Sequence, residues 1–272
     1  MMTATPPVAL VTGASSGIGK AATLALSDAG FRVIGTSRNT SRGASGNGVT
    51  FLDLDVTSDE SVTNVVGRVI ARFGRLDVLV NNAGVGANGA AEEISAAQAQ
   101  RVFDVNVFGL MRMTKAVLPH MRARSSGRII NVSSVAGFVP NPFMAIYVAS
   151  KHAVEGYSES LDHEVREYGV RVLRVQPGPV NTPFDANMVQ ADTPLPVYTG
   201  RRRVFDEVMA ESMRGGDDPA VVAKVIAAAA TDPTPKLRYT AGSTAGRVAA
   251  LRRIVPARAF DKSIRKLNRM TG

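Results

Sequence analysis

The sequence predicts a doubly wound α/β fold, in which helices cover both faces of a parallel β-sheet of about seven strands. Short apolar runs alternate along the chain with longer segments of helical period, the usual pattern of parallel strands joined by crossover helices. A glycine-rich turn separates the first apolar run from the first helical segment. No repeat or shift in composition divides the 272 residues, so we expect a single domain.

The strands and helices follow one another in the order that this fold requires. The expected strands are Val8–Val11, Arg32–Thr36, Thr50–Asp53, Val78–Asn81, Gly127–Val132, Arg171–Gln176 and Arg238–Thr240. The expected helices are a first one that ends near Gly30, then Ser58–Phe73, Ala97–Arg122, Tyr147–Tyr168 and a last one that starts at Asp218-Pro219 and ends near Thr231. Glycine and serine at Ser41–Gly48 predict a surface loop.

The glycine-rich turn predicts a binding site for a dinucleotide cofactor. Its spacing is Gly-x-x-x-Gly-x-Gly, directly after a buried strand and before a helix. Glycines let the backbone approach a pyrophosphate, and the helix N-terminus presents free N–H groups and a positive dipole end. The spacing differs from the long Gly-x-Gly-x-x-Gly fingerprint, and such a turn can also be purely structural. The expected contacts are Gly13, Ser15, Ser16, Gly17, Ile18 and Gly19.

Ser37 and Arg38, which follow the second strand, indicate a preference for NADP(H) over NAD(H). A site for NAD places an acid about 20 residues after the glycines, on the ribose 2′-hydroxyl. Here no acid follows the strand before Asp53, and a guanidinium would pair with a 2′-phosphate. The alternative is that Arg38 is a solvated loop arginine.

Tyr147, Lys151 and Ser134 predict acid–base chemistry at the carboxyl edge of the sheet. Positions i and i+4 share a helix face, so the tyrosine hydroxyl and the lysine ammonium can enter one pocket. A nearby lysine charge favours the phenolate and lowers the tyrosine pKa, which suits Tyr147 to proton transfer. Ser134 would donate a hydrogen bond to the substrate oxygen. Ser133 is the competing hydroxyl, but its side chain should face the other way on an extended strand.

Together these residues resemble the classical short-chain dehydrogenase/reductase family, closely over residues 6–184 and more loosely to Gly242. The resemblance implies a Rossmann-like fold and an enzyme acting on CH–OH and C=O groups. Asn81-Asn82-Ala83-Gly84 is similar to the family's Asn-Asn-Ala-Gly motif. Asn106 matches the fourth member of the family's catalytic tetrad, beside Ser134, Tyr147 and Lys151.

The resemblance also implies further cofactor contacts and an assembly. Asp55 matches the acid that holds the adenine amino group, and Lys151 would bind the nicotinamide ribose. The other implied cofactor contacts are Val56, Asn82, Ala83, Gly84, Tyr147, Pro177, Gly178, Val180 and Thr182. The helix Ala97–Arg122 and the helix from Tyr147 would form a four-helix interface, so a homodimer or homotetramer is expected.

An insert at about 184–216 breaks the alternation and predicts a lid over the substrate. Its apolar side chains suggest an apolar substrate such as a sterol, a retinoid or a long-chain carbonyl. The opposite wall of the pocket would consist of Phe138, Val139, Phe143 and Met144. The alternative is that these side chains pack against the body or a partner.

A second functional class is a non-catalytic cofactor-binding or regulatory protein, although such a protein would not need all three catalytic side chains.

Composition excludes several classes of site. Without cysteine there is no disulfide and no thiolate metal site, and the three histidines lack ligand spacing, so no metal is expected. The first residues lack the charge and apolar core of a signal peptide, and no run of 18 apolar residues exists, so we expect a cytoplasmic protein.

The net charge of +9 resides in the carboxyl-terminal extension. Residues 236–272 hold ten basic residues and one acid, Asp261, while residues 1–235 balance at 22 against 22. We expect residues 1–242 to form the catalytic domain and 243–272 to extend it. Phe260, Ile264 and Leu267 recur there at helical spacing. A basic amphipathic helix could recruit a lipid oxidoreductase to an anionic membrane surface, which is a third functional hypothesis, or it could pack on the body or a sister subunit. Nucleic-acid binding is not expected, since aromatic residues do not interleave the charges.

Overall fold

The computed structural model describes residues 5–40 and 48–270 of the chain. Its main-sheet strands are β1 (Val8–Val11), β2 (Arg32–Ser37), β3 (Val49–Asp53), β4 (Val78–Asn81), β6 (Gly127–Val132), β7 (Val170–Pro177) and β9 (Arg238–Ala241). Its helices include α1 (Gly17–Asp28), α2 (Asp59–Phe73), α3 (Ala96–Phe103), α4 (Leu110–Ala123), α5 (Ala145–Val165), α6 (Thr199–Arg214), α7 (Pro219–Thr231), α8 (Ser243–Ile254) and α9 (Ala257–Leu267). The loop predicted at Ser41–Gly48 lies outside the described residues except for Gly48.

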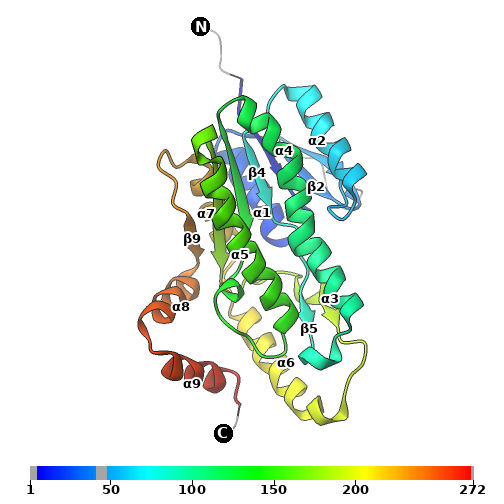
Figure 1. Ribbon diagram of the computed structural model, residues 1–272, viewed down its shortest axis with the longest axis vertical. Helices are drawn as coiled ribbons and strands as arrows, with labels where there is room; N and C mark the ends of the chain where they lie inside the picture. The colour runs from blue at the N-terminus through cyan, green and yellow to red at the C-terminus, as the bar shows by residue number, and fades with distance from the viewer. Residues whose placement is uncertain (1–4, 41–47, 271–272) are drawn as a thin grey trace.

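The predicted doubly wound parallel sheet is confirmed. Within the described residues, seven strands pair in parallel in the order β3-β2-β1-β4-β6-β7-β9 (Figure 1). Helices α1 and α7 cover one face, where Leu26 and Ile226 belong to one buried cluster. Helices α2, α4 and α5 cover the other face through residues such as Val65, Val117 and Leu161. Because both faces are covered, all four residues of β1 and of β4 are buried, with no alternation between buried and exposed positions.

The sheet order creates a crevice at the carboxyl edge of the strands. The chain runs from β1 outward through β2 and β3, and then returns to β4 on the other side of β1. Crossover connections at this switch point leave in opposite directions, so the loops after β1 and β4 part there and make room for a ligand. This edge is where the predicted cofactor and catalytic residues emerge from the sheet.

The expected helix Ala97–Arg122 is instead three joined pieces. Between α3 and α4 lies a π-helical turn, Asp104–Gly109, which carries Asn106. A π-helical turn adds a residue to one turn and shifts the side chains that follow, a device often found at functional sites. Apolar spacing alone does not disclose such a turn.

The insert is more regular than expected. It contains a short strand, β8 (Val189–Gln190), which pairs in parallel with β5 (Ala87–Asn88), and it continues into α6. Phe205 is the residue of α6 that is fully covered, so the helix lacks the apolar stripe that would reveal it in the sequence. None of the helices in the described ranges is long and apolar enough to cross a bilayer.

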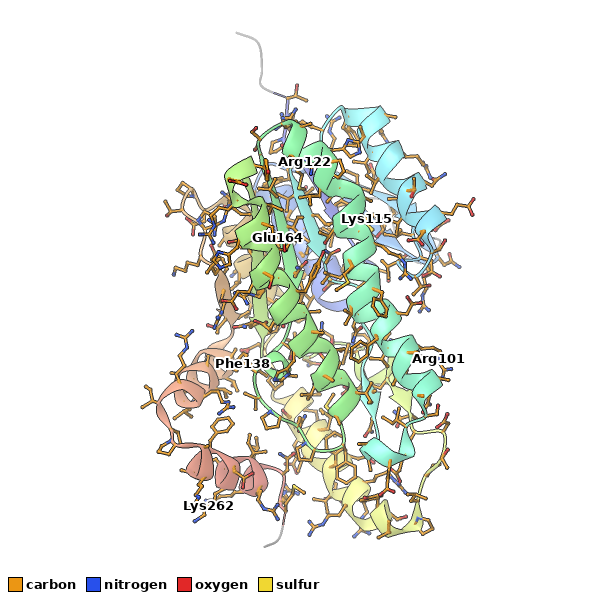
Figure 2. The ribbon with its side chains drawn as sticks, in the orientation of Figure 1. Arg101, Lys115, Arg122, Phe138, Glu164 and Lys262 are labelled. Atoms are coloured by element: carbon orange, nitrogen blue, oxygen red, sulfur yellow. The ribbon has the colours of Figure 1, made fainter. Side chains whose placement is uncertain are left out.

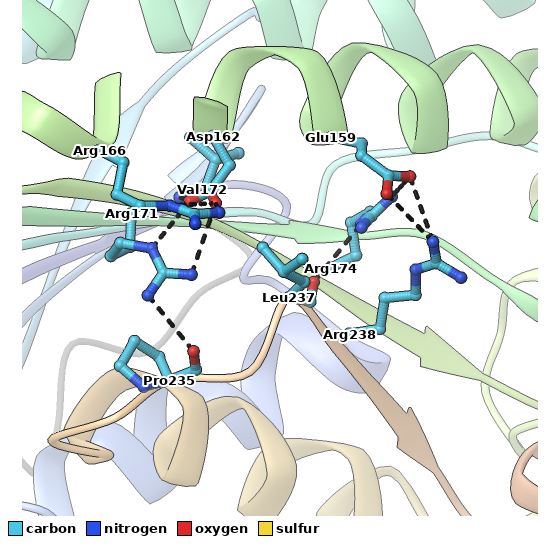
Figure 3. A network of polar contacts seen from close by, with 9 residues as sticks. All are labelled: Glu159, Asp162, Arg166, Arg171, Val172, Arg174, Pro235, Leu237 and Arg238. Carbon is cyan, nitrogen blue, oxygen red and sulfur yellow. Dashed lines mark hydrogen bonds and ion pairs between the residues drawn. The ribbon is translucent and has the colours of Figure 1, made fainter. Parts of the chain in front are cut away.

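A buried ion-pair network fastens α5 to β7 (Figure 3). Asp162 of α5 is fully buried, and its carboxylate accepts from the Arg171 guanidinium at 3.0 Å and the Val172 N–H at 2.8 Å. Arg166 pairs with the same carboxylate. Burial alone would raise the pKa of Asp162, but these hydrogen bonds and the arginine charges hold the pKa below its usual range.

A second group extends the network to β9. The buried Arg174 of β7 donates to Glu159 at 2.9 Å and to the Leu237 carbonyl at 3.4 Å. Glu159 also accepts from Arg238 of β9 at 3.2 Å, which links α5 to the last strand (Figure 3). The helix that carries Tyr147 and Lys151 is therefore fixed to two strands by charge as well as by apolar packing.

Asp162→Asn should destabilise the protein by about 2–3 kcal/mol, because it leaves two arginines without their carboxylate. The loss is smaller than for a fully enclosed pair, since both arginines are partly exposed. Urea unfolding at neutral pH measures the difference. Since the folded pKa of Asp162 is lowered, its contribution is present at neutral pH and fades as the pH falls through that pKa.

The matched control is Glu164→Gln, on an exposed position of the same helix. We expect this control to unfold at the same urea concentration as the parent. Equal stabilities of the Asp162→Asn variant and the control would contradict the role given to the network.

Candidate active site

The glycine-rich turn joins the end of β1 to the start of α1, at the switch point of the sheet. Gly13 and Gly17 adopt φ angles of +65° and +52°, which residues with side chains rarely adopt. A Cβ atom at Gly19 would lie 2.2 Å from the Gly13 carbonyl oxygen, so the turn requires glycine there. Ser16, the N-cap of α1, makes no side-chain cap hydrogen bond and leaves the first-turn N–H groups available. The turn therefore fits a pyrophosphate.

Asn82 ties this turn to the end of β4. Its side-chain Nδ2 donates to the carbonyl oxygens of Thr12 and Gly13 at 2.9 and 3.0 Å. The Thr12 hydroxyl oxygen accepts from the N–H groups of Asn82 and Ala83, both at 3.0 Å. Asn82 and Ala83 thus hold the phosphate-binding turn in shape.

Asn106, on the π-helical turn, is buried close to Lys151. Its Oδ1 accepts from the Val85 N–H at 2.8 Å, and its Nδ2 donates to the Val85 carbonyl at 2.9 Å and to the Ser150 hydroxyl at 3.0 Å. A Cβ at Gly84 would lie 3.4 Å from Asn106 Oδ1 and 3.8 Å from Lys151 Nζ. The π-helical turn therefore joins the segment after β4 to the helix of Tyr147 and Lys151.

Ser134, Tyr147 and Lys151 meet where β6 ends against α5. The Ser134 hydroxyl is hydrogen-bonded to the Tyr147 phenol. Lys151 Nζ donates to the Val132 carbonyl at 2.9 Å and lies 5.8 Å from the centroid of the Tyr147 ring. Both Tyr147 and Lys151 are buried. Ser133 Oγ, by contrast, has no hydrogen-bond partner among the described residues.

Burial governs the charges at this point. It raises the pKa of Tyr147 to about 12, although the hydrogen bond with Ser134 opposes the shift. It lowers the pKa of Lys151 to about 8, against the negative charge of Glu155 one helical turn further on. The expectation that the tyrosine pKa lies below 10 is therefore wrong for the protein alone, because lost hydration outweighs the hydrogen bond with Ser134. A further positive charge beside the phenol would favour the phenolate.

Arg38 and Asp55 lie near each other beyond the ends of β2 and β3. The Asp55 carboxylate accepts from the Thr57 N–H and hydroxyl at 2.9 and 2.7 Å, and these bonds, with the charge of Arg38, hold its pKa below the usual range. The Ser37 hydroxyl donates to the Asn39 carbonyl. Arg38 is exposed and forms no hydrogen bond or ion pair with residues 5–40 or 48–270. Its guanidinium is therefore available to an anion.

The segment after β7 returns to the glycine-rich turn. Val180 forms an isolated parallel bridge with Asp217, which fixes the backbone there. A Cβ at Gly17 would lie 3.1 Å from Thr182 Cγ2, so Thr182 packs directly on the turn. The remaining expected cofactor contacts lie at the same edge of the sheet: Val56 after β3, and Pro177 and Gly178 at the end of β7.

Apolar side chains of the insert pack over Tyr147. The ring centroids of Tyr147 and Phe184 are 5.7 Å apart, and those of Phe143 and Phe205 are 5.6 Å apart. The whole cluster comprises Ala136, Phe143, Met144, Tyr147, Val148, Phe184, Met188, Phe205 and Met209. Of the opposite wall expected from the sequence, Phe143 and Met144 join this cluster, whereas Phe138 and Val139 do not.

Glu93 helps to hold the insert in place, a role that the sequence did not indicate. It is fully buried, accepts from the N–H groups of Ala90 and Leu195 at 2.9 and 2.7 Å, and pairs with Arg202 of α6. Burial would raise its pKa, but these bonds and the Arg202 charge hold the pKa below the usual range. Leu195 is 102 residues away in the sequence, so no local pattern could disclose a carboxylate that fastens the insert.

Comparison with known proteins bears on this arrangement. The profile of one family, the short chain dehydrogenases, matches residues 7–193. The chain is 46% identical over 182 residues to a 3-ketodihydrosphingosine reductase of Bacteroides thetaiotaomicron, and this match covers 67% of each protein. It is 41% identical over 197 residues to retinol dehydrogenase 8 of Bos taurus, and this match covers 68% of this chain and 62% of the retinol dehydrogenase. A crystal structure of a short-chain dehydrogenase from Streptomyces avermitilis matches 98% of both chains with a TM-score of 0.82 and 34% identity.

The matched region contains the elements from which the site is built. It runs from β1 through the glycine-rich turn, the π-helical turn and α5 to the segment after β7. Proteins of this family bind a nicotinamide cofactor and act on CH–OH and C=O groups. The chain belongs to the short chain dehydrogenase family and is an oxidoreductase.

Proposed function

We propose that this protein is an NADP(H)-dependent oxidoreductase that interconverts a secondary alcohol and a carbonyl on an apolar substrate. The observation that carries the proposal is the meeting of Ser134, Tyr147 and Lys151 beneath an apolar cover. A carbonyl bound against Tyr147 and Ser134 would meet two hydroxyl donors while its apolar part contacts the insert. The glycine-rich turn lies along the same edge of the sheet, within reach of a dinucleotide.

The protein's own groups would manage the proton. When bound, the cofactor supplies or accepts the hydride. Tyr147 gives its proton to the substrate oxygen in reduction and takes it back in oxidation. Ser134 hydrogen-bonds that oxygen as charge develops on it. With its pKa raised to about 12, the tyrosine holds its proton at neutral pH, which suits it to act as the acid in carbonyl reduction.

Tyr147→Phe should lower kcat/KM by at least about 100-fold, because it removes the acid–base hydroxyl and nothing that contacts the dinucleotide phosphates. NADPH consumption with an apolar ketone measures turnover, and fluorescence titration measures NADPH binding, which should stay within a few-fold of the parent. Tyr168→Phe, at an exposed tyrosine in the turn after α5, is the control. Substantial turnover in the Tyr147→Phe variant would overturn the acid–base role.

Glu155 adjusts the charge of Lys151 from the next turn of α5. Its carboxylate accepts from Gln176 Nε2 at 2.8 Å and lies 3.5 Å from the Arg174 guanidinium, so it is held in place. Its charge opposes the effect of burial and keeps the Lys151 pKa from falling further. The ammonium next to the tyrosine is thus maintained near neutral pH by a carboxylate that does not touch the substrate region.

Glu155→Gln should shift the alkaline limb of the kcat/KM profile to lower pH. Removing the carboxylate lowers the Lys151 pKa below about 8, so the ammonium is lost earlier as the pH rises. The profile is measured for NADPH oxidation with an apolar ketone. Glu159→Gln is the control, because it removes another carboxylate from Arg174 on the same helix. A limb that stays in place, or that moves equally in both variants, would contradict this role of Glu155.

Arg38 supports the choice of NADP(H). It is exposed at the end of β2 and has no hydrogen-bond partner among the described residues, while the carboxylate of Asp55, whose pKa its charge lowers, is hydrogen-bonded to Thr57. A guanidinium in this position can pair with the 2′-phosphate of NADP. The alternative, a solvated loop arginine, predicts no effect on cofactor choice.

Arg38→Ala should weaken NADPH binding by roughly ten- to a hundredfold, the value of a charge-assisted hydrogen bond to phosphate, and should leave NADH binding nearly unchanged. Fluorescence titration of both cofactors measures the two dissociation constants. Arg124→Ala removes an equal charge from an exposed position after α4 and serves as the control. If both cofactors lose affinity equally, the 2′-phosphate assignment fails.

An apolar substrate follows from the cover over Tyr147. Phe184, Met188 and Met209 offer carbon surface to whatever lies against the tyrosine. The names of two relatives, a 3-ketodihydrosphingosine reductase and retinol dehydrogenase 8, support a lipid-like alcohol or ketone as the substrate.

We propose a cytoplasmic homodimer or homotetramer joined through α4 and α5, since Phe108 between α3 and α4 is a large apolar side chain left exposed. A non-catalytic cofactor sensor remains the second candidate, and the Tyr147→Phe comparison separates the two, because a sensor shows no turnover to lose.

A further inference from the structure

The carboxyl-terminal end of the molecule differs in charge from the rest. Residues 236–272 hold the whole excess of +9, whereas the preceding 235 residues are balanced. In the structure these residues form β9, α8 and α9, and the two helices project from the sheet beside α6 of the insert (Figure 1). The excess charge is therefore concentrated at one end of the protein.

This end is attached to the segment that follows Ser134 and to α6 of the insert. Arg252 of α8 donates to the Phe138 carbonyl at 3.3 Å, four residues after Ser134, and its guanidinium lies 5.0 Å from the centroid of the Phe260 ring in α9. Arg269 pairs with Glu211 of α6 at 2.9 Å. The two helices thus have a defined position next to the insert. The expectation that the extension packs on the body applies to this part of it.

Beyond these contacts, the two helices leave large aliphatic side chains in water. Leu251 and Ile254 of α8 are 52% and 80% exposed, and Leu267 of α9 is 68% exposed. Val197, just before α6 in the insert, is 78% exposed as well. We call the surface formed by α8 and α9 the carboxyl-terminal face. Leu251 and Ile254 are three residues apart on α8 and therefore share one side of that helix, and neighbouring exposed apolar side chains mark a contact surface.

Cations without partners surround these side chains. The side chains of Arg253, Arg258, Lys262 and Lys266 form no hydrogen bond or ion pair within residues 5–40 and 48–270. Asp261 is the one acid among residues 236–272. Figure 2 shows Lys262 pointing outward at this end, with Arg122 at the opposite end of the molecule. The face combines unpaired positive charge with exposed aliphatic groups.

The combination of unpaired positive charge and exposed aliphatic groups indicates which kind of partner the face binds. A second copy docked face to face would bring like charges together, since a twofold interface sets each patch against itself. Nucleic acid would use the charges but leave the aliphatic side chains in water, because aromatic residues for base stacking are absent from the exposed part of the face. An anionic bilayer surface uses both, since it attracts the cations and accepts the aliphatic side chains among its acyl chains.

We propose that the carboxyl-terminal face docks this protein on the surface of anionic lipid membranes. The docking goes beyond the proposed oxidoreductase activity and does not depend on it. Leu251, Ile254 and Leu267 enter the lipid interface, while the surrounding arginine and lysine side chains pair with the headgroups. Because the face adjoins the insert, docking would turn the cover of Tyr147 toward the lipid, where an apolar substrate is dissolved.

The proposal is tested with the full-length protein and two kinds of vesicle. One kind is phosphatidylcholine alone, and the other is phosphatidylcholine and phosphatidylglycerol in equal parts. Sedimentation at low salt should show binding to the anionic vesicles at least about tenfold stronger than to the neutral ones, and added salt should weaken it. Lys262→Glu with Lys266→Glu should reduce that binding at least about tenfold, since each basic side chain near the surface contributes several-fold.

Two further variants separate lipid docking from general attraction. Leu251→Asn with Ile254→Asn keeps every charge and should still lower binding to the anionic vesicles. Arg122→Glu with Arg124→Glu makes the same charge change at the opposite end of the molecule and should leave binding unchanged. Thermal unfolding and turnover on a water-soluble ketone check that each variant is folded, independently of vesicle binding.

Several outcomes would overturn the proposal. It fails if the parent protein does not sediment with anionic vesicles, or if the two charge-reversed variants lose binding equally. It also fails if the Leu251→Asn, Ile254→Asn variant binds anionic vesicles and a DNA duplex as strongly as the parent does, because the face is then a general polyanion site. A protein without turnover on any ketone would still give a clear result in the vesicle assay.

Discussion

The site depends on one contact between a helix and a strand: the hydrogen bond from Lys151 Nζ to the carbonyl of Val132. It sets the lysine at the end of β6, beside Ser134, and through the rigid helix it fixes Tyr147 one turn earlier. An ammonium buried here is costly, and its pKa falls to about 8. The carbonyl and the carboxylate of Glu155 offset part of that cost, so the charge persists where the proton chemistry needs it.

The rest of α5 supports this contact from the other end. Asp162 and Glu159 receive arginines from β7 and β9, and a helix fixed in this way keeps Tyr147 at a constant distance from the glycine-rich turn. The π-helical turn adds a third support, because Asn106 joins the segment after β4 to Ser150 in α5. The polar contacts thus fix the position of α5 along the sheet, while burial of its apolar side chains holds the helix against the sheet.

Much of the fold and of the site could be predicted from the sequence, for local reasons. Strand β1 is a continuous apolar run, and the glycine-rich turn and the Tyr147–Lys151 spacing are short-range patterns. The π-helical turn and α6 could not be predicted, because a one-residue shift and a largely exposed helix leave no periodic trace. Glu93 and the raised pKa of Tyr147 depend on burial by residues far along the chain, which only the folded structure supplies.

The insert covers the tyrosine, and the two carboxyl-terminal helices belong to the part of the chain that carries the excess charge. The central claim is that an NADP(H) site and an acid–base tyrosine serve one reaction. The most direct measurement titrates the purified protein with NADPH and NADH by fluorescence and then adds a panel of apolar ketones. The account predicts tighter binding of NADPH than of NADH, followed by NADPH oxidation with at least one ketone. Binding of neither cofactor would contradict it.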